Sequence, residues 1–132
     1  MSHPTHSKAP TQRQLRVGEE IRHALSDIFL RGGFSREPAL DVPITVSEVR
    51  IGPDLKHATA YVMPLGGLNS EGVLQALHRA APGLRYEVSK RVKLRHSPQI
   101  HFKLDHSFDE AHRIEKLLKR PEVARDLKKV DE

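Results

Sequence analysis

Residues 70–104 read SEGVLQALHRAAPGLRYEVSKRVKLRHSPQIHFKL, a run in which helical periodicity gives way to strand periodicity. Behind the capping residues Asn69 and Ser70, apolar residues recur at the spacing of a short amphipathic helix, up to Ala80. Ala81-Pro82-Gly83 comes next, and we expect it to interrupt the helix. Proline removes a backbone donor and pushes the residue before it away from helical angles, and glycine frees the next position.

A second helix and a strand are predicted after this break. Apolar residues recur every four positions from Leu84 through Val88 to Val92, which is one stripe of a helix. Ile100, Phe102 and Leu104 then alternate with polar residues, which is typical of a half-buried strand. The whole stretch therefore predicts helix, break, helix and strand.

The preceding residues predict a helix and a hairpin. One apolar helical stripe covers residues 13–31, and Gly32-Gly33 ends it. Apolar residues alternate over 42–51, with a phase slip at Ser47-Glu48 that indicates a β-bulge. After turn residues at 52–54, residues 56–63 are expected to form the second strand of the hairpin.

The two ends of the chain differ from this patterned middle. Ser107 and Glu110 form a capping box in front of a last helical stripe that stops before Pro121. We expect flexible tails at 1–12 and 119–132, around one domain at 13–118. The predicted order is α-β-β-α-kink-α-β with a C-terminal helix, an α+β domain whose three-stranded sheet packs on helices.

The positive charge of the chain is concentrated in one segment. The 132 residues contain 22 Lys+Arg and 17 Asp+Glu, a formal net charge of +5. Between Arg79 and Lys103 we count seven basic residues and one acidic residue, a net charge of +6, so the remaining residues sum to −1. Because solvated surfaces usually mix both signs, this asymmetry favours a polyanionic partner.

A helical wheel of the segment after the break separates an apolar side from a basic side. Arg91 falls beside the apolar stripe and is expected to lie along the protein surface instead of contacting RNA. The basic side combines cations, a hydroxyl and an aromatic ring, which suits phosphates and unpaired bases. For the ring, a contact with the rim of the core is an equally good interpretation. The predicted RNA-binding residues are Arg79, Arg85, Tyr86, Ser89, Lys90, Lys93, Arg95 and Lys103.

Composition and motifs exclude several other classes. The chain has no cysteine, and no apolar run is long enough for a membrane span. The first ten residues contain no apolar signal stretch, so we expect a cytoplasmic protein. His96, His101 and His106 recur every five residues, a spacing that places them on no common face of a helix or strand. With no nucleophile elbow or phosphate-binding loop, we expect no enzyme activity, metal or cofactor.

One alternative function remains open at this level. A helix, a three-residue break and a basic second helix are also the parts of a helix-turn-helix that binds DNA. A winged version would require a β-hairpin after the basic helix, whereas one strand and then a helix are predicted here. DNA binding is therefore kept as the second hypothesis.

Ordered short motifs across the chain point to a family. They include 16–22 (RVGEEIR), 46–49 (VSEV), 53–55 (PDL), 58–62 (ATAYV), 94–98 (LRHSP), 100–102 (IHF) and 105–107 (DHS). With Ala81-Pro82-Gly83 between the helices, their order and spacing over residues 13–118 resemble the bacterial ribosome-binding factor A family. In that family an Ala-x-Gly element replaces the Gly-x-x-Gly loop of ordinary KH domains.

The resemblance implies both a fold and a function. It implies a type II KH-like domain that binds the 16S rRNA of immature, free small ribosomal subunits as a monomer. It also implies a role in maturing the rRNA 5′ end region, often important in the cold. One motif departs from the family, because Glu37-Pro38-Ala39 stands where Asp-Pro-Arg is usual.

Overall fold

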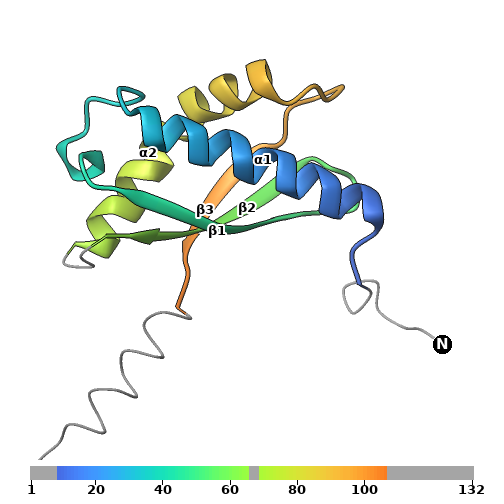
Figure 1. The fold of residues 1–132 in the computed structure, drawn as a ribbon, viewed down its shortest axis with the longest axis horizontal. Helices are drawn as coiled ribbons and strands as arrows, with labels where there is room; N and C mark the ends of the chain where they lie inside the picture. The colour runs from blue at the N-terminus through green and yellow to red at the C-terminus, as the bar shows by residue number, and fades with distance from the viewer. Residues whose placement is uncertain (1–8, 66–68, 107–132) are drawn as a thin grey trace, which may run out of the picture.

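The computed structural model describes residues 9–65 and 69–106 (Figure 1). Along the chain the elements follow the order α1 (Gln12–Arg31), the 3-10 turn η2 (Pro38–Leu40), β1 (Ile44–Ile51), β2 (His57–Pro64), α2 (Ser70–Arg91) and β3 (Gln99–Leu104). The predicted C-terminal helix and the C-terminal tail lie outside the described residues, as does most of the predicted N-terminal tail. No helix among the described residues is long and apolar enough to cross a membrane.

The first helix matches its prediction and begins one residue earlier. Thr11, which we expected in the flexible tail, caps the helix by accepting a hydrogen bond from the Gln14 amide. The Thr11 amide in turn donates to the side-chain oxygen of Gln14, so two backbone donors that would otherwise be unpaired are satisfied. Gly32 ends the helix at φ 71°, a left-handed angle that glycine adopts without strain.

The sheet has the order β1-β2-β3. β1 pairs antiparallel with β2, and their register shifts between Val46 and Glu48, which confirms the predicted bulge. β3 lies parallel to β2, with Ala60 opposite Phe102. Because side chains alternate between the two faces of a strand, Ile100 and Phe102 are buried while Gln99, His101 and Lys103 are exposed.

The prediction that Ala81-Pro82-Gly83 interrupts the helix is wrong. α2 is one helix of 22 residues that contains Pro82. Its apolar stripe keeps helical phase across the proline, through the buried residues Leu77, Leu84 and Val88. Burying that stripe outweighs the roughly 3 kcal/mol that an internal proline costs. Figure 1 shows the helix axis changing direction near its middle, so the segment bends and does not break.

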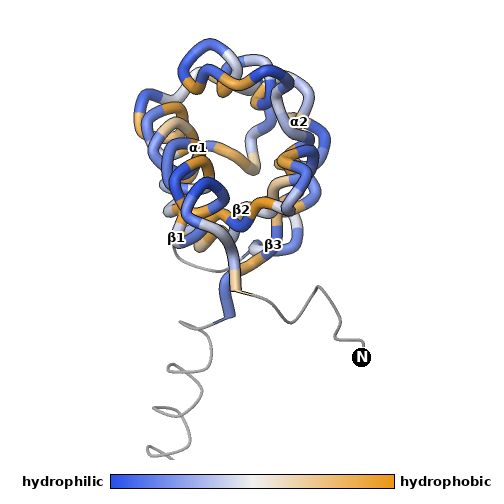
Figure 2. Tube along the Cα trace, turned by 90° about the vertical axis from the view of Figure 1, so that its right-hand side faces the viewer, coloured by the Kyte–Doolittle hydropathy of each residue, from blue (hydrophilic) through white to orange (hydrophobic). Residues whose placement is uncertain are grey.

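Both helices pack on the same face of the sheet (Figure 2), and no other described element covers the opposite face. The core between them contains Ile21, Leu25, Val62, Leu77 and Phe102, each at most 2% exposed. α1 approaches β1 closely at Gly18, where an added Cβ would lie 2.7 Å from the carbonyl oxygen of Val49. This arrangement leaves the outer surface of α2 and the loop after it open to a partner.

Candidate RNA-binding surface

The basic residues after α2 lie on a loop and not on a helix. α2 ends at Arg91, and Val92 is already extended, so Lys93 leaves the helical face on which the wheel placed it. Val92, Leu94 and Pro98 are turned toward the core, while Lys93 and Arg95 are exposed between them. Neither cation forms an ion pair with another described residue. The loop therefore presents two uncompensated positive charges on a backbone that buried side chains anchor.

Arg85 links this loop to α2. Its Nε and Nη2 atoms both donate to the carbonyl oxygen of Ser97, at 3.1 and 2.7 Å. Because the acceptor is neutral, the positive charge of Arg85 is not cancelled. Arg85 can therefore attract an anion and also position the segment that carries Lys93 and Arg95.

We expect Arg85→Lys to weaken RNA binding although it keeps the charge. A lysine ammonium cannot reproduce the two bonds by which the planar guanidinium converges on the Ser97 carbonyl oxygen, so the attachment of the loop to α2 would weaken. Hydrogen exchange should become faster at the amides of residues 93–97, and the affinity for RNA should fall about threefold or more. An Arg85→Lys variant with unaltered loop exchange would show that the bond to Ser97 has no positioning role.

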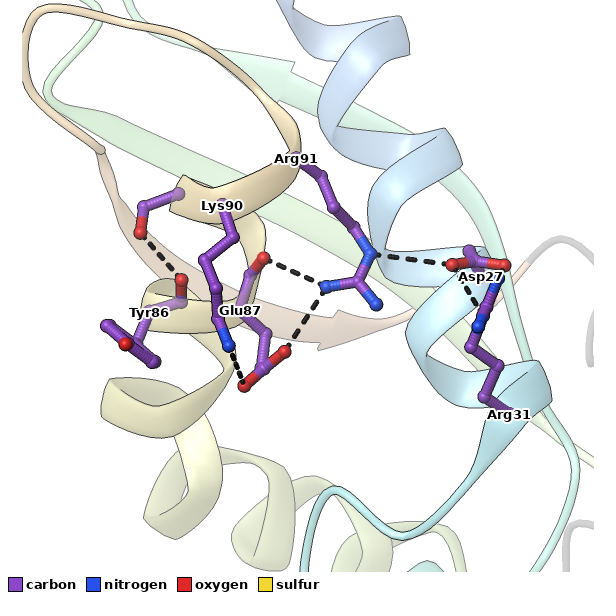
Figure 3. Close-up of polar contacts among 7 residues, drawn as sticks. Asp27, Arg31, Tyr86, Glu87, Lys90 and Arg91 are labelled. Carbon is purple, nitrogen blue, oxygen red and sulfur yellow. Dashed lines mark hydrogen bonds and ion pairs between the residues drawn. The ribbon is translucent and has the colours of Figure 1, made fainter.

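Lys90 and Arg91 differ from the loop cations because they share an acidic partner, which offsets one of their two charges. Glu87 lies 3.3 Å from the Lys90 ammonium and 3.2 Å from the Arg91 guanidinium. The hydrogen bond from Arg91, followed by that from Lys90, lowers the pKa of Glu87. Arg91 also forms an ion pair with Asp27 on α1, at 3.4 Å (Figure 3), and so links the two helices. This position agrees with the helical wheel, which placed Arg91 beside the apolar stripe. The charge count included Glu87 but assigned it no partner, although it lies one turn before Arg91 at the spacing of a helical ion pair.

Tyr86 is well placed to contact a base. The residue is 63% exposed, and the Lys90 ammonium lies 4.7 Å from the centre of its ring. This exposure favours stacking over the alternative in which the ring packs on the rim of the core. The hydroxyl of Ser89, also in the predicted set, donates to the Tyr86 carbonyl at 2.6 Å and is engaged within the helix.

The structure separates two of the predicted residues from this group. Lys103 projects from the open face of the sheet, beside Tyr61 in the β2–β3 register, whereas α2 covers the other face. Arg79 forms a two-pronged ion pair with Glu37, in the connection between α1 and β1. The surface that remains is Arg85, Tyr86, Lys93 and Arg95, with Lys90 partly neutralised at its edge.

A cleft of about 500 Å³ borders this surface. α2 contributes His78, Ala81, Pro82 and Arg85 to its lining, and β3 contributes Gln99, Ile100 and His101. Gly83 faces a separate hollow of about 320 Å³, toward Gly32 and Phe34. The two hollows are lined by different residues of α2, and Arg85, which lines the cleft, also bonds to the basic loop at Ser97.

Among the described residues, no group of three or more His, Cys, Asp or Glu side chains could hold a metal ion. His57 and His101 are neighbours on the open face of the sheet, with ring nitrogens 3.2 Å apart, a contact that only strand pairing reveals. The helix–break–helix unit on which the DNA-binding alternative depended is also absent from the described residues, because α2 is continuous.

Comparison with known proteins gives these features a family context. Ribosome-binding factor A from Rhodospirillum rubrum is 54% identical, over 93% of this chain and 75% of the relative. The crystal structure of ribosome-binding factor A from Thermus thermophilus is 25% identical, covers 69% of this chain and 94% of its own, and has a TM-score of 0.56. A Thermus thermophilus homology structure with that name, fitted into a cryo-EM map of a 30S complex, is 23% identical, covers 70% and 96%, and has a TM-score of 0.58.

These likenesses confirm the predicted α+β, KH-like fold. The family described as Ribosome-binding factor A matches residues 13–118, the same range that the motif series covers. The chain belongs to the ribosome-binding factor A family.

Proposed function

We propose that this protein binds the 16S rRNA of the immature small ribosomal subunit and assists its late maturation, including processing of the 5′ end. The observation that carries the proposal is the anchored basic loop, where Lys93 and Arg95 are exposed without acidic partners among the described residues. Family membership supports the choice of partner, as does the relative that was fitted into a 30S complex.

The mechanism uses binding energy and requires no catalytic group. Lys93, Arg95 and Arg85 would neutralise phosphates and release counterions, which gives affinity without sequence preference. Tyr86 would stack on an unpaired base beside them, and the bend around Pro82 would set the angle at which the two halves of α2 meet the RNA. A protein that binds one rRNA conformation better than another shifts the population toward it, and this shift would be the assistance.

The proposal extends to the setting in which the protein works. It would act in the cytoplasm as a monomer and without a cofactor, on free small subunits and not on complete ribosomes. Its importance would be greatest in the cold, because misfolded rRNA helices rearrange more slowly at low temperature. Lys103, on the far side of the sheet, would make at most a separate contact.

Competition binding at one fixed salt concentration tests the partner. Labelled protein bound to gradient-purified immature small subunits should be displaced by unlabelled subunits far more effectively than by duplex DNA or an unrelated structured RNA. Crosslinking within the same complex should join Tyr86 or the 93–95 loop to 16S rRNA. Stronger displacement by duplex DNA, with a sharp dependence on its sequence, would favour the DNA-binding hypothesis instead.

A further inference from the structure

Glu37 holds Arg79 in a geometry that a phosphate would otherwise use. Its two carboxylate oxygens accept from Nε and Nη2 of Arg79, at 2.7 and 2.8 Å. Arg–carboxylate and Arg–phosphate pairs share this parallel, two-bond arrangement. The carboxylate therefore occupies the donor edge of Arg79 as an internal substitute for a phosphate.

The backbone around Glu37 keeps the carboxylate in place. The Glu37 amide donates to the Ser35 hydroxyl at 3.1 Å, and the Glu37 carbonyl accepts from the Leu40 amide at 3.0 Å. Pro38 follows directly and restricts the backbone of Glu37 to extended angles. The acid is thus presented by a fixed turn, 42 residues from its partner along the chain.

This arrangement distinguishes Arg79 from the three cations of the candidate surface. Arg85 bonds to a neutral carbonyl, and Lys93 and Arg95 have no acidic partner among the described residues. The hydrogen bond from Arg79 lowers the pKa of Glu37, so the acid is ionised at neutral pH and cancels the charge of the guanidinium. Arg79, at 57% side-chain exposure, is accessible but not attractive to a polyanion at long range.

We propose that Glu37 is a specificity-determining residue. Its carboxylate competes with RNA phosphates for the Arg79 guanidinium, and only a phosphate that the rest of the interface already holds in position displaces it. The inference rests on the proposed RNA binding. An exposed ion pair contributes little stability, so a phosphate already oriented by the loop contacts can replace the carboxylate. A phosphate that another RNA holds only loosely cannot displace the carboxylate. The protein therefore discriminates between its own RNA and other RNAs.

Glu37→Gln tests the inference, with Glu48→Gln as the matched control. Glu48 forms an exposed pair with Arg50 on β1, through one hydrogen bond of 2.8 Å where the Glu37–Arg79 pair has two. Affinity for an unrelated structured RNA should rise about fivefold in Glu37→Gln, and the salt dependence should steepen by roughly one phosphate contact. Affinity for immature small subunits should rise by less than about twofold, because the native phosphate displaces Glu37 already.

A double variant tests whether the gain in affinity depends on Arg79. Glu37→Gln combined with Arg79→Gln should bind the unrelated RNA as the wild type does, since the released guanidinium is gone. Equal gains on both RNAs, an equal gain in Glu48→Gln, no gain in Glu37→Gln, or a gain that survives in the double variant would each overturn the inference. Failure of the wild-type protein to bind small subunits would instead contradict the proposed function, and the same titrations measure it directly.

Discussion

Replacing Lys93 and Arg95 together by glutamate should reduce affinity for immature small subunits by about two orders of magnitude near physiological salt. Each reversal removes a cation that has no acidic partner among the described residues and adds a repelled anion at the same place. The magnitude follows from counterion release, because a cation that no longer neutralises a phosphate no longer releases its counterion. Titrations at several salt concentrations should therefore show both weaker binding and a shallower salt slope.

The matched control changes the same net charge elsewhere. Arg13→Glu with Arg16→Glu alters two exposed residues on the first turns of α1, outside the 93–95 segment. That variant should lose far less affinity, and both variants should unfold at nearly the wild-type temperature because all four side chains are exposed. Equal losses in the two variants would mean that total charge, and not the loop, determines binding.

Gly18→Ala should destabilise the fold by about 2 kcal/mol, although alanine is the better helix former. The added methyl carbon would lie 2.7 Å from the backbone oxygen of Val49, closer than the two atoms can pack. A backbone oxygen in a paired strand cannot turn aside, so α1 would have to move outward. Moving it loosens the packing of Val17 and Ile21 against the sheet. Urea unfolding monitored by circular dichroism measures the change.

Gly83→Ala is the control for this prediction. Gly83 is also inside a helix, but a Cβ added there meets nothing within 4 Å. The same substitution should therefore stabilise the protein, by up to about 1 kcal/mol. Opposite signs at the two glycines would confirm that the approach of α1 to β1 limits position 18. A neutral or stabilising Gly18→Ala would show that α1 can shift without loss.

Much of the fold is predictable because its signals are local. The apolar spacing and terminal glycines of α1, the bulge after Val46 and the alternation in β3 each depend on residues a few positions apart. The prediction failed at Pro82, where a local rule gave a break. The rule omits the free energy gained by burying Leu77 and Leu84 on the sheet, and that burial exists only in the folded domain.

The candidate surface was predictable only in part. The sequence located the excess charge between Arg79 and Lys103, but a helical wheel or a strand alternation places each residue only within its own element. Folding divides the cations. Arg79 meets Glu37, and Lys103 turns to the far face of the sheet.

The sequence by itself determined the α1 helix, the hairpin with its bulge, the final strand and the segment that carries the net positive charge. The tertiary structure decided that α2 is continuous and that Lys93 and Arg95 lie exposed on an anchored loop, without acidic partners among the described residues. The reason is physical. Periodicity and capping act between neighbours in the chain, whereas burial and ion pairing act between groups that only the folded backbone brings together, such as Glu37 and Arg79.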